Sequence, residues 1–177
     1  MKKVVLFFAI AIAAVSANAQ TGKGTWLLGG SAGFSSGKSS GSSSTTMVNI
    51  SPDAGYFFAD NFAAGLNLGF QSQSNGGTTT NFNVGPFARY YFLPLGEHAK
   101  LFGQGAFGFG TYKPASGSSV NSTVWEIKAG PSFFLNESVA LETALFYNSD
   151  KVKSSSAYNT FGLSVGFQIH FNCGHKK

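Results

Sequence analysis

Large apolar residues alternate with small or polar ones near the end of the chain, from residue 158 to residue 171. The apolar positions are Phe161, Leu163, Val165, Phe167, Ile169 and Phe171. Successive side chains of a β-strand point to opposite faces, so this period of two predicts one strand with two chemically different faces. The run is also longer than the roughly 5–6 residues of an ordinary soluble strand.

The same alternation recurs along the chain and predicts eight strands in all. They cover residues 25–35, 45–58, 62–72, 80–92, 99–112, 122–135, 139–148 and 158–171. Phe102 interrupts the pattern of the fifth run. Proline cannot donate a ladder hydrogen bond, so we expect a bulge at Pro52, Pro86 and Pro131.

The connections between the predicted strands alternate in length. Residues 59–61, 93–98 and 136–138 form short turns, and residues 36–44, 73–79, 113–121 and 149–157 form longer loops rich in Ser, Gly and Asn. This asymmetry is typical of an all-β, up-and-down barrel of eight antiparallel strands in the outer membrane, with short periplasmic turns and longer outward loops. In that barrel the apolar faces contact lipid, whereas in a soluble barrel they fill the interior.

The start of the chain predicts export. Met1-Lys2-Lys3 precedes an apolar run from Val4 to Val15 and the small-residue site Ala17-Asn18-Ala19, the arrangement of a secretory signal peptide. We expect cleavage after Ala19, which gives a signal peptide over residues 1–19 and a barrel domain over residues 20–177. No later apolar run reaches the about 20 residues of a spanning helix.

Charge and cysteine content narrow the possible partners. Removal of Lys2 and Lys3 lowers the formal net charge from +5 to +3, which is too weak and too scattered to favour nucleic acid. Cys173 is the single cysteine, so no internal disulfide framework is possible. Lysines in the predicted long loops favour anionic groups such as those of lipopolysaccharide, although a solvated loop surface is the simpler interpretation.

Aromatic residues gather near both ends of the predicted strands, where a membrane barrel carries its two aromatic girdles. The predicted girdle residues are Trp26, Phe58, Phe62, Tyr90, Phe92, Trp125, Tyr147 and Phe171.

The opposite, inward faces carry amides and a few charges. The predicted lumen cluster comprises Arg89, Gln104, Glu126, Lys128, Glu142 and Gln168. Isolated charges in a narrow lumen are costly, so we expect them to pair. An eight-stranded barrel is just wide enough to be filled by side chains, which argues against a general porin.

No catalytic or metal-binding constellation emerges. His98 lies in a short turn, His170 at the end of the last strand and His175 in the tail, so none is placed beside a serine at the outer surface. We therefore expect neither enzymatic activity nor a cofactor or metal site.

The mature chain resembles the small outer-membrane β-barrels of the OmpX and OmpA transmembrane-domain type, in the variant common in Bacteroidetes. The residues that carry the resemblance are Gly24-Thr25-Trp26, Ser51-Pro52, Gly55-Tyr56-Phe57, Ala59-Asp60-Asn61, Gly65-Leu66-Asn67 and the aromatic-ended last strand. The resemblance implies a monomeric barrel in the Gram-negative outer membrane, inserted by the barrel-insertion machinery.

The sequence thus favours an integral outer-membrane barrel of the cell envelope. Its role would be structural or a surface interaction through the loops, with lipopolysaccharide or an extracellular ligand as possible partners. Two alternatives stay open: a narrow or gated channel, and a soluble, secreted, lipocalin-like binding barrel.

Overall fold

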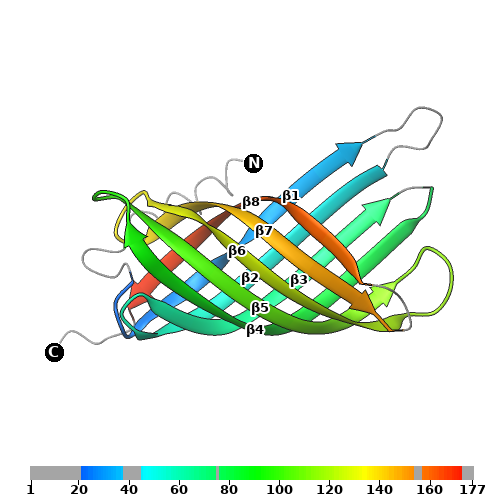
Figure 1. Cartoon of the computed structure of the whole chain (residues 1–177), viewed down its shortest axis with the longest axis horizontal. Helices are drawn as coiled ribbons and strands as arrows, with labels where there is room; N and C mark the ends of the chain where they lie inside the picture. The colour runs from blue at the N-terminus through cyan, green and yellow to red at the C-terminus, as the bar shows by residue number, and fades with distance from the viewer. Residues whose placement is uncertain (1–20, 38–44, 75, 154–156, 173–177) are drawn as a thin grey trace, which may run out of the picture.

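The computed structural model describes residues 21–37, 45–74, 76–153 and 157–172, and all of its strands belong to one closed antiparallel barrel (Figure 1). Each strand pairs with its neighbours in the chain, and the last pairs with the first. The strands are β1 (Thr25–Gly37), β2 (Thr45–Ala59), β3 (Phe62–Ser74), β4 (Thr78–Pro94), β5 (Ala99–Lys113), β6 (Val120–Phe134), β7 (Val139–Val152) and β8 (Tyr158–Asn172). The predicted eight-stranded up-and-down fold is confirmed.

Several strands run further into the predicted long loops than the sequence pattern indicated. Thr78 pairs with Ser74 and Asp150 pairs with Tyr158, so much of the loops predicted over residues 73–79 and 149–157 is strand. The backbones of threonine and serine form ladder hydrogen bonds as well as those of apolar residues do. A run of these polar residues, however, does not show the alternation of apolar and polar side chains from which the strands were predicted. We call the end with the β2–β3, β4–β5 and β6–β7 turns the short-turn end, and the other the long-loop end.

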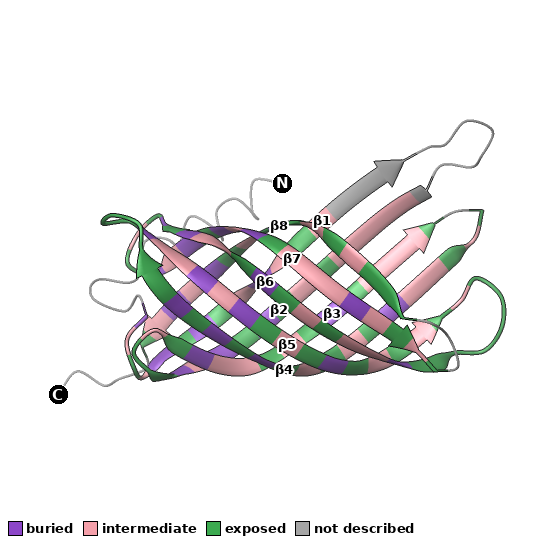
Figure 2. Ribbon diagram, viewed as in Figure 1, coloured by how far each residue is buried: buried purple, intermediate pink, exposed green. Residues whose placement is uncertain are grey.

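The apolar faces point outward, as predicted for a membrane barrel. On β8, Phe161 is 69% exposed and Leu163 is 66% exposed, whereas Gln168 is 1% exposed. Figure 2 shows the same alternation of buried and exposed residues along the other strands. A soluble lipocalin-like barrel requires the opposite orientation.

The inward face is not polar throughout, which corrects the predicted separation of apolar from polar residues. Leu27, Phe57, Phe87, Phe102 and Phe134 are buried inside the barrel. Phe102 therefore does not break the alternation of β5: it occupies an inward position that happens to be apolar.

The bulges predicted at the prolines are absent. The β2–β3 register is the same on both sides of Pro52, although the pairs at residues 51 and 52 are missing. Pro86 and Pro131 interrupt the β4–β5 and β6–β7 ladders in the same way. The register shifts instead lie near the short turns, between Phe57 and Ala59 and between Tyr91 and Leu93. A missing proline donor is thus accommodated by skipping ladder positions rather than by inserting a residue.

No helix long and apolar enough to cross a membrane occurs in the described ranges. The predicted signal peptide and Cys173 lie outside the described residues, so those two expectations remain predictions.

Candidate functional site in the barrel lumen

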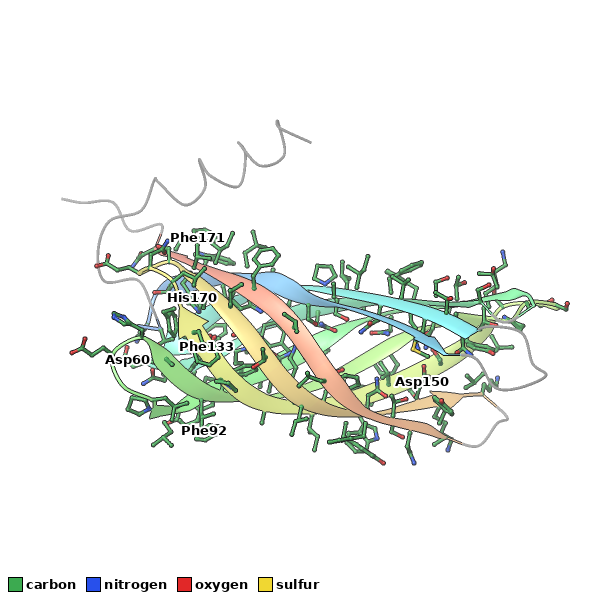
Figure 3. All side chains as sticks on the ribbon, turned by 90° about the horizontal axis from the view of Figure 1, so that it is seen from above. Asp60, Phe92, Phe133, Asp150, His170 and Phe171 are labelled. Carbon is green, nitrogen blue, oxygen red and sulfur yellow. The ribbon has the colours of Figure 1, made fainter. Side chains whose placement is uncertain are left out.

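The lumen begins at the short-turn end with a layer of packed rings, which we call the aromatic floor: Phe57, Tyr91, Phe102, Phe134 and His170. Ring centroids are 6.0 Å apart for Phe57 and Tyr91, and 5.4 Å apart for Phe134 and His170. Figure 3 places His170 at the same end as Asp60 of the β2–β3 turn. His170 is fully buried, and its Nε2 lies 3.4 Å from the Tyr91 hydroxyl. The floor thus fills the barrel at its short-turn end.

Arg89 lies next to the floor and links strands on opposite sides of the lumen. Its Nη1 donates to both carboxylate oxygens of Glu142, at 2.9 and 3.2 Å, and its Nε donates to Gln104 Oε1 at 2.7 Å. Its Nη2 lies 3.6 Å from Asp53 Oδ2. The guanidinium also stacks over Phe102, 4.7 Å from the ring centroid. These contacts join β2, β4, β5 and β7 through one fully buried side chain.

Two further side chains complete this group, which we call the ionic cluster: Asp53, Arg89, Tyr91, Gln104, Glu142 and Gln168. Gln168 Nε2 donates to Asp53 Oδ2 at 3.2 Å, and the Tyr91 hydroxyl lies 3.3 Å from Glu142 Oε1. Breaking such a buried pair by removing one partner costs far more than a surface pair. The ionic cluster and the aromatic floor therefore act as one layer across the lumen.

The sequence reasoning missed Asp53, Tyr91 and the phenylalanines of the floor. Asp53 follows the outward-facing Pro52, so strict alternation through the proline would have placed it inside. Tyr91 likewise occupies the same face as Arg89, two residues away.

Glu126 and Lys128 occupy neighbouring inward positions on β6, but the structure does not bring them together as an ion pair. Lys128 is 8% exposed. Within the described part of the chain, neither side chain makes a hydrogen bond or a contact ion pair, although their opposite charges attract each other at longer range. Inward positions two residues apart on one strand lie roughly 7 Å apart, so two parallel side chains do not meet without bending toward each other.

Beyond Lys128 the lumen widens into a cavity of about 340 Å³. Most of its lining is polar or small, and both Glu126 and Lys128 belong to it. Its amide side chains are Asn49, Asn67, Gln71, Asn83 and Asn148. The lumen is thus packed by the ionic cluster and the aromatic floor toward the short-turn end, and it is hollow toward the long loops.

Polar groups also gather at the two rims. Toward the long loops, the Asn81 amide donates to the Asp150 carboxylate, and Ser122 Oγ donates to Asn81 Oδ1 at 3.3 Å. At the short-turn end, Lys100 Nζ donates to Thr21 Oγ1 at 2.6 Å, which ties the segment before β1 to the barrel.

The predicted girdle residues lie on the outer wall. Six of them are exposed: Trp26, Phe58, Phe62, Tyr90, Phe92 and Trp125. Tyr147 and Phe171 are half-buried, and the rings of Trp125 and Tyr147 contact each other with centroids 5.4 Å apart. In Figure 3, Phe92, Phe133 and Phe171 all lie at the short-turn end, on different sides of the barrel. Their depth in a bilayer stays a prediction.

The predicted absence of a metal site also remains a prediction. The described ranges contain no group of three or more His, Cys, Asp or Glu side chains able to hold a metal ion.

Comparison with known protein families matches residues 5–174 to the outer membrane protein β-barrel domain. The chain belongs to this family. It is therefore an outer-membrane β-barrel protein, and its relatives in the family are barrel proteins of the same membrane.

Solved structures support the same fold. The crystal structure of neisserial surface protein A (NspA) is 19% identical, with a TM-score of 0.60, and the match covers 84% of this chain and 98% of that one. The N-terminal β-barrel domain of Pseudomonas aeruginosa OprF is 14% identical, with a TM-score of 0.52 and coverage of 85% and 99%. OprG of Pseudomonas aeruginosa is 14% identical, with a TM-score of 0.50 and coverage of 88% and 99%. No curated protein matches by sequence. At these identities the likeness extends to the fold alone.

Proposed function

We propose that this protein is a monomeric, non-conducting, non-enzymatic barrel of the Gram-negative outer membrane with a structural or surface-interaction role. The observation that carries the proposal is the layer formed by the ionic cluster and the aromatic floor. Arg89 is 0% exposed and bonded to Glu142, and Phe57 and Tyr91 pack beside it. Such a layer opposes the passage of water and solutes along the axis.

The surface role concerns the long-loop end. Lys113, Lys151 and Lys153 are exposed there, so lipopolysaccharide phosphates or an extracellular ligand are the proposed partners. The name of neisserial surface protein A, which shares the fold, is in keeping with such a role. The proposal includes a cleaved signal peptide and insertion by the barrel machinery.

Conductance tests the proposal most directly. The purified chain, reconstituted in a planar bilayer, should show no steady conductance, because the buried side chains of the ionic cluster and the floor pack across the lumen. Regular porin-sized openings would contradict a closed barrel. Fractionation with the outer membrane and heat-modifiable migration on a gel serve as controls for correct folding.

A gated channel is the second candidate, and one observation favours it. Lys128 and Glu142 line the same small space beside the ionic cluster, so exchange of Glu142 from Arg89 to Lys128 is a short movement. In that case Glu142→Gln should change the frequency of brief openings, whereas Glu126→Gln, higher in the lumen, should not. Identical silent traces for both variants and the wild type would reject the channel.

A further inference from the structure

The ladder between β1 and β8 is the shortest in the barrel. Its pairs run from Thr25–Asn172 to Ala32–Val165, whereas the β1–β2 ladder continues to Gly37 and the β7–β8 ladder to Tyr158. Figures 1 and 3 show the two strands diverging toward the long-loop end. We call this unpaired stretch the seam: residues 33–37 of β1 and 158–164 of β8. No pair between these described residues joins the two strands.

The outer lip of the seam is apolar. Phe161 and Leu163 are among the most exposed large side chains of the whole wall, so the seam faces hydrocarbon rather than water. An apolar lip suits a hydrocarbon chain, whereas a polar headgroup needs the hydrogen-bonding groups that lie on the inner side of the wall.

The inner side of the seam opens on the lumen cavity. Ser31 and Gly33 from β1, together with residues 160–164 of β8, line that cavity. The space inside the wall thus extends to both edges of the seam. It is bounded by amides and glycines on the inside and by Phe161 and Leu163 on the outside.

The cavity also contains a cation that no anion contacts directly. Lys128 is more than nine-tenths buried, lines the cavity and makes no hydrogen bond or contact ion pair with any residue in the described ranges. Glu126, Asp53 and Glu142 attract its charge at longer range, and its ammonium group is left to pair directly with an anionic group in the cavity. Glu126 offers the opposite charge from the next inward position, roughly 7 Å away along the strand.

We propose that the seam is a lateral portal and that the cavity binds the headgroup of a single-chain zwitterionic amphiphile from the surrounding bilayer. The anionic group of the head lies against Lys128, the cationic group lies toward Glu126, and the amides of the cavity bind the remaining polar atoms. The hydrocarbon chain leaves past Phe161 and Leu163. The site goes beyond the proposed function and is compatible with it, because the ionic cluster closes the lumen below.

A titration with dodecylphosphocholine tests the site. The full mature chain, purified in a maltoside detergent, is followed by NMR as the mole fraction of dodecylphosphocholine in the micelles rises. We expect saturable shifts at Lys128 and at the cavity amides, with at least tenfold weaker binding for Lys128→Met. Lys23→Met, which replaces an exposed lysine at the short-turn end, should bind as the wild type does.

The same titration with phosphocholine, which lacks the chain, separates a soluble ligand from an amphiphile. If phosphocholine binds as tightly as dodecylphosphocholine, the proposal that the ligand is an amphiphile is wrong. If the Lys128→Met variant binds dodecylphosphocholine with unchanged affinity, the proposed cavity site is wrong. The heat-modifiable gel shift verifies that the variant is folded.

A disulfide across the seam tests the portal. Gly33→Cys with Ser164→Cys, in a Cys173→Ser background, should slow binding of dodecylphosphocholine at least tenfold when oxidised and recover on reduction. The control disulfide, Ala32→Cys with Val165→Cys, joins the last registered pair and should leave binding unchanged. Equal binding rates for the oxidised and reduced seam, or cysteine cross-links between copies in place of within one chain, would overturn the portal.

Discussion

At the scale of single residues, two glycines before prolines decide how closely the strands approach. A Cβ added to Gly85 would overlap the carbonyl oxygen of Phe107, and one added to Gly130 would overlap that of Thr143. Both glycines lie where Pro86 and Pro131 interrupt the ladder. Because glycine has no side chain, the neighbouring backbone can approach closely without a clash at the point where the following proline offers no N–H to the ladder.

Gly85→Ala should consequently destabilise the barrel by about 1–3 kcal/mol, the usual cost of overpacking. Urea unfolding in lipid vesicles, followed by the heat-modifiable gel shift, measures the loss. Gly105→Ala is the matched control, since no atom lies within 4 Å of a Cβ added there. Equal stability of the two variants would contradict the close-approach argument.

Arg89 is the second residue with a large expected effect. Arg89→Leu leaves Glu142 and Asp53 buried without their cation, and should cost about 3–5 kcal/mol. The same unfolding assay applies, with Lys151→Leu as an exposed control that should change stability little. A loss below about 1 kcal/mol would mean that other groups in the lumen compensate the carboxylates.

The lumen shows how far residue-level prediction from sequence reaches. Alternation placed Arg89, Gln104 and Glu142 on inward faces, and the structure brings them within hydrogen-bond distance. Asp53 escaped notice because the proline before it disturbed the count. That Lys128 stays unpaired was not predictable, because pairing depends on the relative heights of side chains on different strands, and the sequence pattern of one strand does not contain them.

At the scale of strands, the outward face of each strand requires apolar side chains, whereas the inward face accepts polar and charged ones. Leu145 lies on the outward face of β7, opposite Leu163 on β8, and is exposed. Lipid on that face makes an ionic side chain costly, whereas the connections outside the strands tolerate one.

Leu145→Arg should therefore cost about 2–4 kcal/mol if the residue lies near the bilayer midplane. Ser118→Arg, in the exposed β5–β6 connection, should cost little. Folding yield into lipid vesicles at increasing urea compares the two variants. If both fold equally well, the outward face of β7 does not contact lipid.

The strands themselves were predictable because alternation is a local property. Their ends were less so: Ser149, Asp150 and Lys151 read as loop residues, yet they extend β7 and pair with β6 and β8. The inward aromatic residues were not predicted either. The apolar side chain of a phenylalanine such as Phe102 suggests the outer face, whereas its position in the alternation places it on the inner face.

At the scale of the whole molecule, the barrel is closed at one end and hollow toward the other. The aromatic floor and the ionic cluster occupy the short-turn end, and the cavity lies above Lys128. The number of predicted strands indicated a lumen narrow enough to be filled by side chains. That number does not determine which part of the lumen the side chains fill. The seam was equally hidden, because the regular alternation of β8 says nothing about which strand lies beside it.

The short β1–β8 ladder also bears on assembly. It connects residues from opposite ends of the described chain, from Thr25 to Asn172, so it closes the largest loop and carries the greatest chain-entropy cost of any strand pair. The hairpins between consecutive strands need no such closure and can zip first. We therefore expect the contact that completes the ring, which has the fewest registered pairs, to form last and to be the line along which the cylinder first opens on heating.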